Sequence, residues 1–296
     1  MPELADIFRL YGPQYREKYG ASMLPSHLQA MEDIVNCRTP SMGGQLYFCD
    51  HCQELHYSYH SCKNRHCPKC QNDMTQDWIQ KQRQLLLPVQ HFLLTFTLPS
   101  TLRKITRSNQ KTIYHILINS SASSLQKLAH DPRFIGGKLA MIGVLHTWDR
   151  KRGYHPHIHF LIPGAALSPD HSTWLPARED FLLPVKPLSL IFRATFRDQL
   201  KKTPLYDSVP KETWKKDWVV HSEPVGSGIE TMKYLAPYIF RVAISNNRLI
   251  SIDNNEVSFR YQDSTTKQWN TLTLPALIFI RRFLQHLLPK AFIKVR

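Results

Sequence analysis

All six cysteines of this 296-residue chain lie between residues 37 and 70. That segment is also rich in His, Asn and Gly, and its few apolar side chains show no sustained helical or strand period. A segment of this kind cannot fold around an apolar core of its own, whereas bound metal can supply the missing folding free energy. The cysteine segment therefore predicts a metal-organised module.

Two pairs of cysteines have the spacing of zinc knuckles, namely Cys49-x-x-Cys52 and Cys67-x-x-Cys70. Four thiolates from two such turns can form a tetrahedral site for Zn²⁺, a borderline-soft ion. We therefore expect one structural zinc ion held by these four cysteines.

Cys37 and Cys62 remain, among several histidines. A second zinc ion could use these two cysteines with two of the histidines, and His60 and His66 are the candidates that we favour. The alternative is that several of the histidines are surface donors or phosphate contacts.

The chain carries 38 Lys and Arg against 23 Asp and Glu, a formal net charge of +15. Such an excess indicates a polyanionic partner, either nucleic acid or an anionic membrane surface. Lys63, Arg65 and Lys69 lie between the cysteines and could face a DNA backbone, although a solvated basic face explains them equally well.

Membrane insertion is not expected. The first 20 residues lack the apolar run of a signal peptide, and the most apolar stretch near the end is interrupted by Arg281 and Arg282. We expect a soluble, cytoplasmic protein. In that compartment clustered cysteines are more typical of metal sites than of disulfides.

The remaining patterns predict an α+β protein. Residues 1–36 are expected to be helical, and residues 72–85 to form a short polar helix. After residue 90, strands and helices mix, and the sequence predicts strands 91–98, 137–148, 155–163 and 218–224, helices 105–130, 183–202 and 274–287, and a hairpin over 248–262. We divide the chain into a zinc-binding DNA-recognition domain (1–85) and a catalytic domain (86–296).

Three histidines alternate along the strand predicted at residues 155–163, in the run His155-Pro-His157-Ile-His159. Residues two apart on a strand face the same side, so His157 and His159 present two imidazoles in register. Two adjacent imidazoles on a rigid strand suit a divalent ion that keeps open coordination positions. We expect His157 and His159 to be metal ligands.

Two tyrosines, Tyr234 and Tyr238, have helical i, i+4 spacing, after a capping box formed by Ser227 and Glu230. Their phenols would project from one helix face. A phenol is a poor nucleophile by itself, but it can attack phosphorus beside a metal that polarises a phosphodiester. Packing is the usual role of such a pair, and the histidine strand is what favours catalysis here.

A His-hydrophobe-His strand followed by a helical Tyr-x3-Tyr resembles the HUH single-strand endonucleases. Five blocks, from about residue 20 to the end and in the family's order, are more closely similar to the transposases of insertion-sequence family ninety-one: CRTPSMGGQLYFCDHC, YHSCKNRHCPKC, VLHTWDRKRGYHPHIHFLIPG, FLLPVKPLSLIFR and YLAPYIFRVAISNNRLI. Pro237, between the tyrosines, departs from a regular helix. Similar members usually continue beyond KAFIKVR, so we expect a further C-terminal portion.

The resemblance implies an N-terminal zinc-binding module and an HUH endonuclease domain, an antiparallel sheet flanked by helices. It implies Mg²⁺ or Mn²⁺ on His157 and His159, with Tyr234 and Tyr238 as nucleophiles. The implied activity is rolling-circle transposition, in which one strand of DNA is nicked, its 5′ end is retained on tyrosine, and it is rejoined. The expected partner is single-stranded DNA or the hairpin ends of an element.

Two points stay open. The family commonly uses a third polar ligand, for which four residues are candidates: Glu223, Glu230, His155 and His221. The competing functions are a zinc-dependent DNA-binding regulator without catalysis, and a plasmid relaxase or replication initiator that shares the HUH chemistry.

Overall fold

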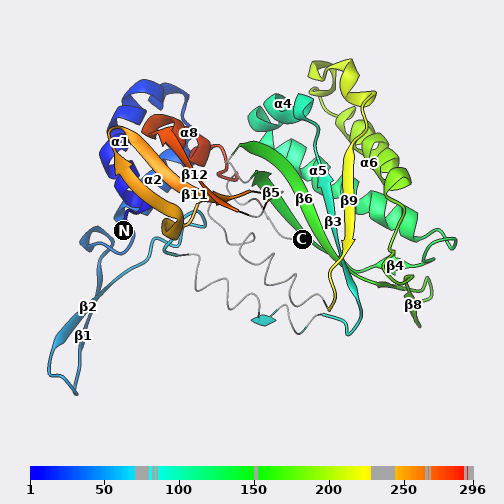
Figure 1. Ribbon diagram of the computed structural model, residues 1–296, viewed down its shortest axis with the longest axis horizontal. Coiled ribbons are helices and arrows are strands. Elements are labelled where there is room, and N and C mark those ends of the chain that lie inside the picture. Colours follow the sequence, from blue (N-terminus) through cyan, green and yellow to red (C-terminus); the bar gives the residue numbers. More distant parts are fainter. Residues whose placement is uncertain are drawn as a thin grey trace. The chain divides into compact units, whose positions relative to one another are not determined.

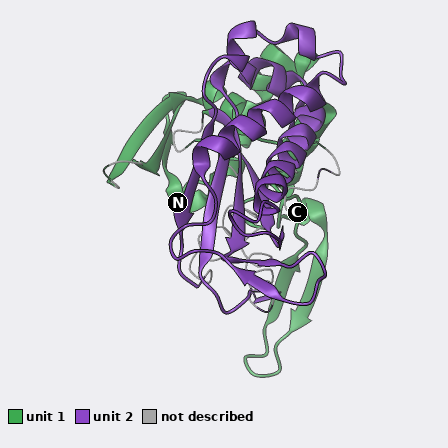
Figure 2. Ribbon diagram, turned by 90° about the vertical axis from the view of Figure 1, so that its right-hand side faces the viewer, with its two compact units in different colours: residues 1–77, 148–153, 240–290 green, residues 78–147, 154–239, 291–296 purple. Residues whose placement is uncertain are grey.

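The computed structural model describes residues 1–70, 80, 81, 84, 86–149, 153–227, 244–263, 266, 268–289 and 292. The chain forms two compact units, coloured separately in Figure 2. Unit 1 comprises residues 1–77, 148–153 and 240–290, and unit 2 comprises residues 78–147, 154–239 and 291–296. Helices flank antiparallel sheets, which confirms the predicted α+β class with its N-terminal zinc-binding domain.

Unit 1 begins with helices α1 (Leu4–Tyr19) and α2 (Pro25–Asn36), as predicted for residues 1–36. The strands β10 (Leu249–Asp253), β11 (Glu256–Gln262) and β12 (Trp269–Pro275) form a sheet, followed by helix α8 (Ala276–Leu284). Asn254 and Asn255 both have positive φ (48° and 62°), the conformation that a two-residue hairpin turn requires. The hairpin was predicted, whereas β12 was not.

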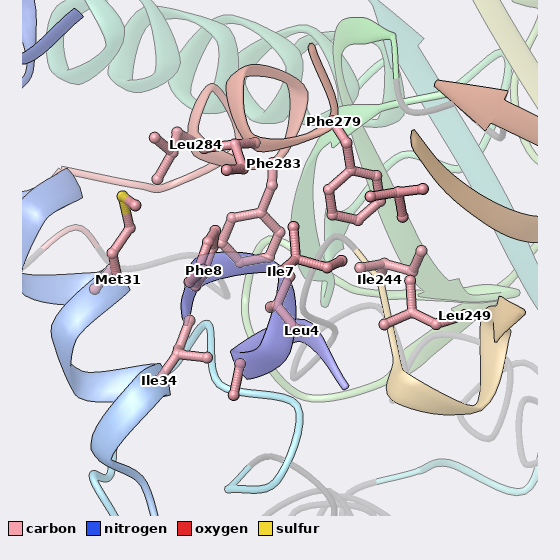
Figure 3. Close-up of a cluster of buried hydrophobic side chains, with 14 of the residues drawn as sticks. Leu4, Ile7, Phe8, Met31, Ile34, Ile244, Leu249, Phe279, Phe283 and Leu284 are labelled. Atoms are coloured by element: carbon pink, nitrogen blue, oxygen red, sulfur yellow. The ribbon is translucent and has the colours of Figure 1, made fainter. Parts of the chain in front are cut away.

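The core of unit 1 combines side chains from the N-terminal helices with side chains from residues 244–287 (Figure 3). Phe8 of α1 packs edge-on against Phe283 of α8, with ring centroids 5.5 Å apart. The two N-terminal helices bury one apolar face each, and the segment 244–288 supplies the opposing apolar surface. A linear division at residue 85 assigns residues 240–290 to the catalytic domain, whereas in the structure they pack with the N-terminal helices.

Strands β1 (Gly44–Phe48) and β2 (Leu55–Tyr59) form an antiparallel hairpin in the cysteine segment, where no regular period was expected. Every residue of both strands is exposed. We call this element the zinc-module hairpin.

Unit 2 contains a four-stranded sheet in the order β5-β6-β3-β9, visible in Figure 1. Its strands are β3 (His91–Thr97), β5 (Ile142–Trp148), β6 (Tyr154–Pro163) and β9 (Val219–Pro224). All four were predicted. Thr95, in the central part of β3, lies opposite His159 of β6 on one side and His221 of β9 on the other.

Helices α5 (Gln110–Ala129) and α6 (Val185–Leu200) pack on each other and against one face of this sheet (Figure 1). Phe96 of β3 meets Phe192 of α6 edge-on, with centroids 5.0 Å apart. The expected helix 105–130 is divided at Asn109, which separates the short helix α4 (Arg103–Ser108) from α5. A small sheet of β4 (Lys138–Leu139), β7 (Ala165–Leu167) and β8 (Trp174–Pro176) completes the unit.

Two predicted helices fall largely outside the described residues. These are the polar helix over 72–85 and the tyrosine helix that begins with the Ser227–Glu230 capping box. Among the helices that the structure describes, none combines the length and the apolarity needed to cross a bilayer.

Gly143 of β5 provides a test of the sheet packing. A Cβ added at Gly143 would lie 2.6 Å from the Phe160 ring. We predict that Gly143→Ala lowers the free energy of unfolding by about 1–3 kcal/mol, because the core must shift to admit the methyl group. Urea unfolding measures the change. Gly20→Ala is the control, because its Cβ would have no neighbour within 4 Å. Equal effects of the two substitutions would contradict this account of the packing.

Candidate functional site

Three histidines converge on the sheet face opposite helices α5 and α6. His157 and His159 alternate along β6, as predicted, and His146 comes from the neighbouring strand β5. One ring nitrogen from each histidine lies within 4.8 Å of the others. The ring centroid of His146 lies 5.1 Å from that of His157 and 4.5 Å from that of His159. We call this group the histidine triad.

Strand alternation explains why His146 joins the triad. Gly143 faces the Phe160 ring in the core, so position 146, three residues along the same strand, faces the other side. His146 was not among the predicted ligands, because the third ligand was expected near the tyrosines. The available signal was the block VLHTW, which sits on a strand directly before the His157–His159 strand.

Hydrogen bonds at Nδ1 orient two of the rings. His157 donates from Nδ1 to the backbone carbonyl of His155 at 2.6 Å, which fixes its tautomer. His159 Nδ1 lies 2.8 Å from the Thr95 hydroxyl. Both rings therefore present Nε2 toward the triad, an arrangement in which outer partners orient the ligands of a metal.

Burial keeps these imidazoles neutral. It lowers the pKa of His157 well below its usual value, and the nearby His159 and His155 lower it further. Burial also lowers the pKa of His159 to about 4. A neutral imidazole has a lone pair available for a metal at neutral pH. The triad is thus electrostatically suited to a cation.

Of the four residues considered as third ligands, His155 lies beside His157, with ring centroids 5.1 Å apart, but no described one belongs to the triad. His155 Nδ1 accepts a hydrogen bond from Arg103 of α4 at 2.8 Å. His221 and Glu223 are exposed on β9, separated from β6 by β3. Glu230 lies outside the described residues, as do Tyr234 and Tyr238.

Another tyrosine, Tyr154, begins the histidine strand but is not suited to nucleophilic attack. Its hydroxyl is 2.7 Å from that of Tyr114, on the helix-covered side of the sheet. Burial raises the pKa of Tyr154 to about 12. Strand β6 therefore presents neutral imidazoles without a ready phenolate.

The four-cysteine cluster consists of Cys37, Cys62, Cys67 and Cys70, whose sulfur atoms lie within 4.8 Å of one another. Corners of a tetrahedron with Zn–S bonds of about 2.3 Å are about 3.8 Å apart. The observed Sγ–Sγ separations of 3.4 Å (Cys37–Cys70) and 3.6 Å (Cys62–Cys70) approach that value. These residues therefore fit a structural zinc ion.

Hydrogen bonds and burial shift the pKa values of the thiols in this cluster in different directions. Hydrogen bonding from Cys62 lowers the pKa of Cys67 to about 5. Burial raises the pKa of Cys37 to about 11, and the hydrogen bond to Cys67 raises the pKa of Cys62. Metal-free, these shifts favour a thiolate at Cys67 and thiols at Cys37 and Cys62, and a bound cation would favour ionisation of those two as well.

This grouping differs from the predicted one. Cys49 and Cys52 do not meet Cys67 and Cys70, because they lie at the tip of the zinc-module hairpin. Five strand residues at about 3.3 Å each separate that tip from the base by about 16 Å. At the base, the Arg38 N–H donates to the His60 carbonyl at 3.1 Å, and this pairing brings Cys37 beside Cys62.

The two histidines expected with Cys37 and Cys62 are placed differently. His60 is exposed, and His66 Nε2 accepts a hydrogen bond from the Leu288 backbone N–H at 3.4 Å. Neither belongs to a metal-ligand group among the described residues. Instead, Cys49 and Cys52 form a group of three with His56 of β2, which was not predicted as a ligand.

The three basic residues of the zinc module have different surroundings. Arg65 is partly buried and donates to the carbonyls of Leu288 (3.3 Å) and Pro289 (2.6 Å). Lys69 forms an ion pair with Glu3 at 2.7 Å, whereas Lys63 is exposed. Their contact with DNA stays a prediction, and Arg65 and Lys69 also connect the module to the rest of unit 1.

Comparison with known proteins agrees with this combination of a zinc module and a histidine-bearing sheet. A family model described as "Putative transposase" matches residues 140–296, and one described as "Transposase zinc-binding domain" matches residues 7–98. A third, described as "LAGLIDADG-like domain", matches residues 72–130, a stretch whose strand β3 pairs with β6 of the transposase match.

Two curated relatives are transposases. The chain is 36% identical to "Putative transposase y4qJ" of Sinorhizobium fredii, over 100% of this chain and 79% of the relative. It is 26% identical to "Transposase for insertion sequence element IS801" of Pseudomonas savastanoi pv. phaseolicola, over 91% and 68%. No solved structure matches the chain.

With its histidine-bearing antiparallel sheet and its cysteine-rich module, the chain is by these matches a DNA-acting enzyme of the transposase class. The chain belongs to the transposases of insertion-sequence family ninety-one.

The lowered pKa of His159 predicts how the metal-free protein responds to acid. The unfolded ring takes up a proton below about pH 6.5, whereas the folded ring does so only near pH 4. The free energy of unfolding should therefore fall as the pH drops from about 6.5 to 4, with His159 contributing about 1–3 kcal/mol of the loss.

Urea unfolding of His159→Asn at several pH values measures this share. The variant should lose less stability over that range than the wild type. His115→Gln, at an exposed position of α5, serves as the control and should follow the wild type. Parallel curves for His159→Asn and the wild type would contradict the prediction.

Proposed function

We propose that this transposase nicks and rejoins one DNA strand through a tyrosine, with a divalent cation held by the histidine triad. The observation that carries the proposal is the convergence of His146, His157 and His159 on one sheet face. Such a face, with its ligands held rigidly by two strands and by Nδ1 hydrogen bonds, suits the binding of a metal that acts on a phosphate.

The donor set bears on which cation binds. Imidazole nitrogen is a softer donor than the oxygen ligands that Mg²⁺ prefers. Of the two expected ions, Mn²⁺ therefore suits the three imidazoles better than Mg²⁺. When bound, the cation would act as a Lewis acid toward the scissile phosphodiester.

Tyr234 and Tyr238 are the proposed nucleophiles, on the strength of their i, i+4 spacing and of the family. The phenol oxygen forms a bond to phosphorus, and the bond between phosphorus and the 3′ oxygen breaks. The phenol loses a proton and the 3′ oxygen gains one, which leaves a 5′-phosphotyrosine and a free 3′-OH. A second attack reverses these bonds, so that strands are joined without nucleotide hydrolysis.

The DNA substrate is proposed to be single-stranded or a hairpin end, bound by a protein that works at the bacterial nucleoid. The zinc-module hairpin offers a surface for unpaired bases. Tyr57 and Tyr59 lie on one face of β2, with their rings 6.5 Å apart and 22° from parallel. Unpaired bases stack on such rings, and the +15 charge attracts the backbone.

A covalent adduct tests the proposed chemistry. Incubation of the wild type with labelled single-stranded element ends and Mn²⁺ should give a protein–DNA adduct on a denaturing gel. His146→Ala should slow adduct formation about 100-fold or more, since loss of several kcal/mol of charge stabilisation has that effect. Mn²⁺ should support a faster reaction than Mg²⁺.

Two further variants complete this test. Tyr234→Phe combined with Tyr238→Phe should give no adduct, and an adduct that survives would reject these nucleophiles. His115→Ala, exposed on α5, is the control for loss of an imidazole. Full activity of His146→Ala would show that His146 is not needed to bind the cation.

The stacking surface gives a separate prediction on affinity. Tyr57→Ala should weaken binding of single-stranded DNA about 5- to 100-fold, as expected for loss of one stacked base, with an unchanged salt dependence. Tyr47→Ala is the matched control, because Tyr47 pairs with His56 on the opposite face of the same hairpin. Fluorescence anisotropy measures both, and equal losses would argue against a stacking face.

A further inference from the structure

The zinc-module hairpin lacks the packing that usually stabilises a β-hairpin. All ten residues of β1 and β2 are exposed, including Phe48 (54%), Leu55 (57%) and Tyr57 (68%). An isolated two-stranded hairpin is at best marginally stable in water. Backbone pairing along five residue pairs therefore needs support from some other interaction.

The tip of the hairpin gathers three metal-ligand side chains. Cys49 directly follows β1, Cys52 lies in the turn and His56 is in β2. One ligand atom from each lies within 4.8 Å of the others, and Cys52 Sγ is 3.6 Å from His56 Nε2. Two strands and their turn thus contribute to one compact group.

The backbone of the turn supports this grouping. The Cys49 N–H donates to the Glu54 carbonyl at 2.9 Å, and the Gln53 N–H donates to the Cys49 carbonyl at 2.8 Å. Gln53, directly after the Cys-x-x-Cys turn, adopts a positive φ of 56° where the chain reverses toward β2.

We propose that Cys49, Cys52 and His56 bind a second Zn²⁺, separate from the four-cysteine cluster. Two thiolates and an imidazole are ligands that zinc prefers. The four-cysteine cluster is largely buried and supplies a full tetrahedral set, whereas this group is open to solvent and leaves the fourth position to water. The bound ion cross-links the two strands at their tip, which stabilises a hairpin without a core.

This proposal goes beyond strand cleavage and does not depend on it. The parent for its test is the full chain with His157→Ala and His159→Ala, so that the histidine triad takes up no metal. After zinc reconstitution and removal of free metal, elemental analysis should give about two zinc ions per chain. Cys49→Ser combined with Cys52→Ser should give about one.

Cobalt substitution identifies the ligands. Thiolate-to-Co²⁺ absorption grows with the number of bound thiolates, and loss of two among six should remove about one third of it. The hairpin should also become sensitive to protease in the Cys49/Cys52 variant, whereas the thermal transition of the unit 1 core should change little. His51→Ala, in the same turn but outside the group, is the matched control and should retain two ions.

Several results would overturn the second site. These are one zinc ion per parent chain, an unchanged ion count in the Cys49/Cys52 variant, or the same loss in His51→Ala. Cys62→Ser changes a ligand of the four-cysteine cluster alone. The hairpin should keep its protease resistance in this variant, which would show that the two sites act independently.

Discussion

The antiparallel pairing of β3 with β6 is the constraint on which the proposed active site depends. It places Thr95 opposite His159 and Thr97 opposite His157, with Ile158 and Phe160 turned into the helix-covered core. A shift of register by one residue would turn the imidazoles toward the helix-covered core and the apolar side chains toward the opposite face. The burial of Phe160 against Phe96, with ring centroids 5.9 Å apart, thus holds the histidines on the face opposite the helices.

The stability of unit 1 depends on a core that is built from distant parts of the chain. Helices α1 and α2 alone bury too little apolar surface to be stable, and α8 and the sheet before it complete the core. Cys37, Cys67 and Cys70 lie at the edge of that core. The zinc module is therefore held to the rest of unit 1 by the packing of these cysteines and by contacts such as the ion pair of Lys69 with Glu3.

Much of the fold followed from local patterns. The alternation of His157 and His159 and the turn at Asn254-Asn255 each depend on neighbours in sequence, and both were predicted correctly. Strand β12 was missed because its side chains are mostly exposed and show little apolar alternation. His146 was missed because its role depends on which face of β5 meets the core, and the contact of Gly143 with Phe160 decides that.

The sequence by itself determined the chemistry that this protein carries. Its cysteines belong to a zinc-binding domain, its alternating histidines place two imidazoles on one strand face, and its blocks identify a transposase family. Only the tertiary structure decided which ligands act together. Cys37 and Cys62 joined Cys67 and Cys70, and Cys49 and Cys52 joined His56, because a hairpin separates its tip from its base. Knuckle spacing is a local property, whereas a coordination shell is set by pairing between strands.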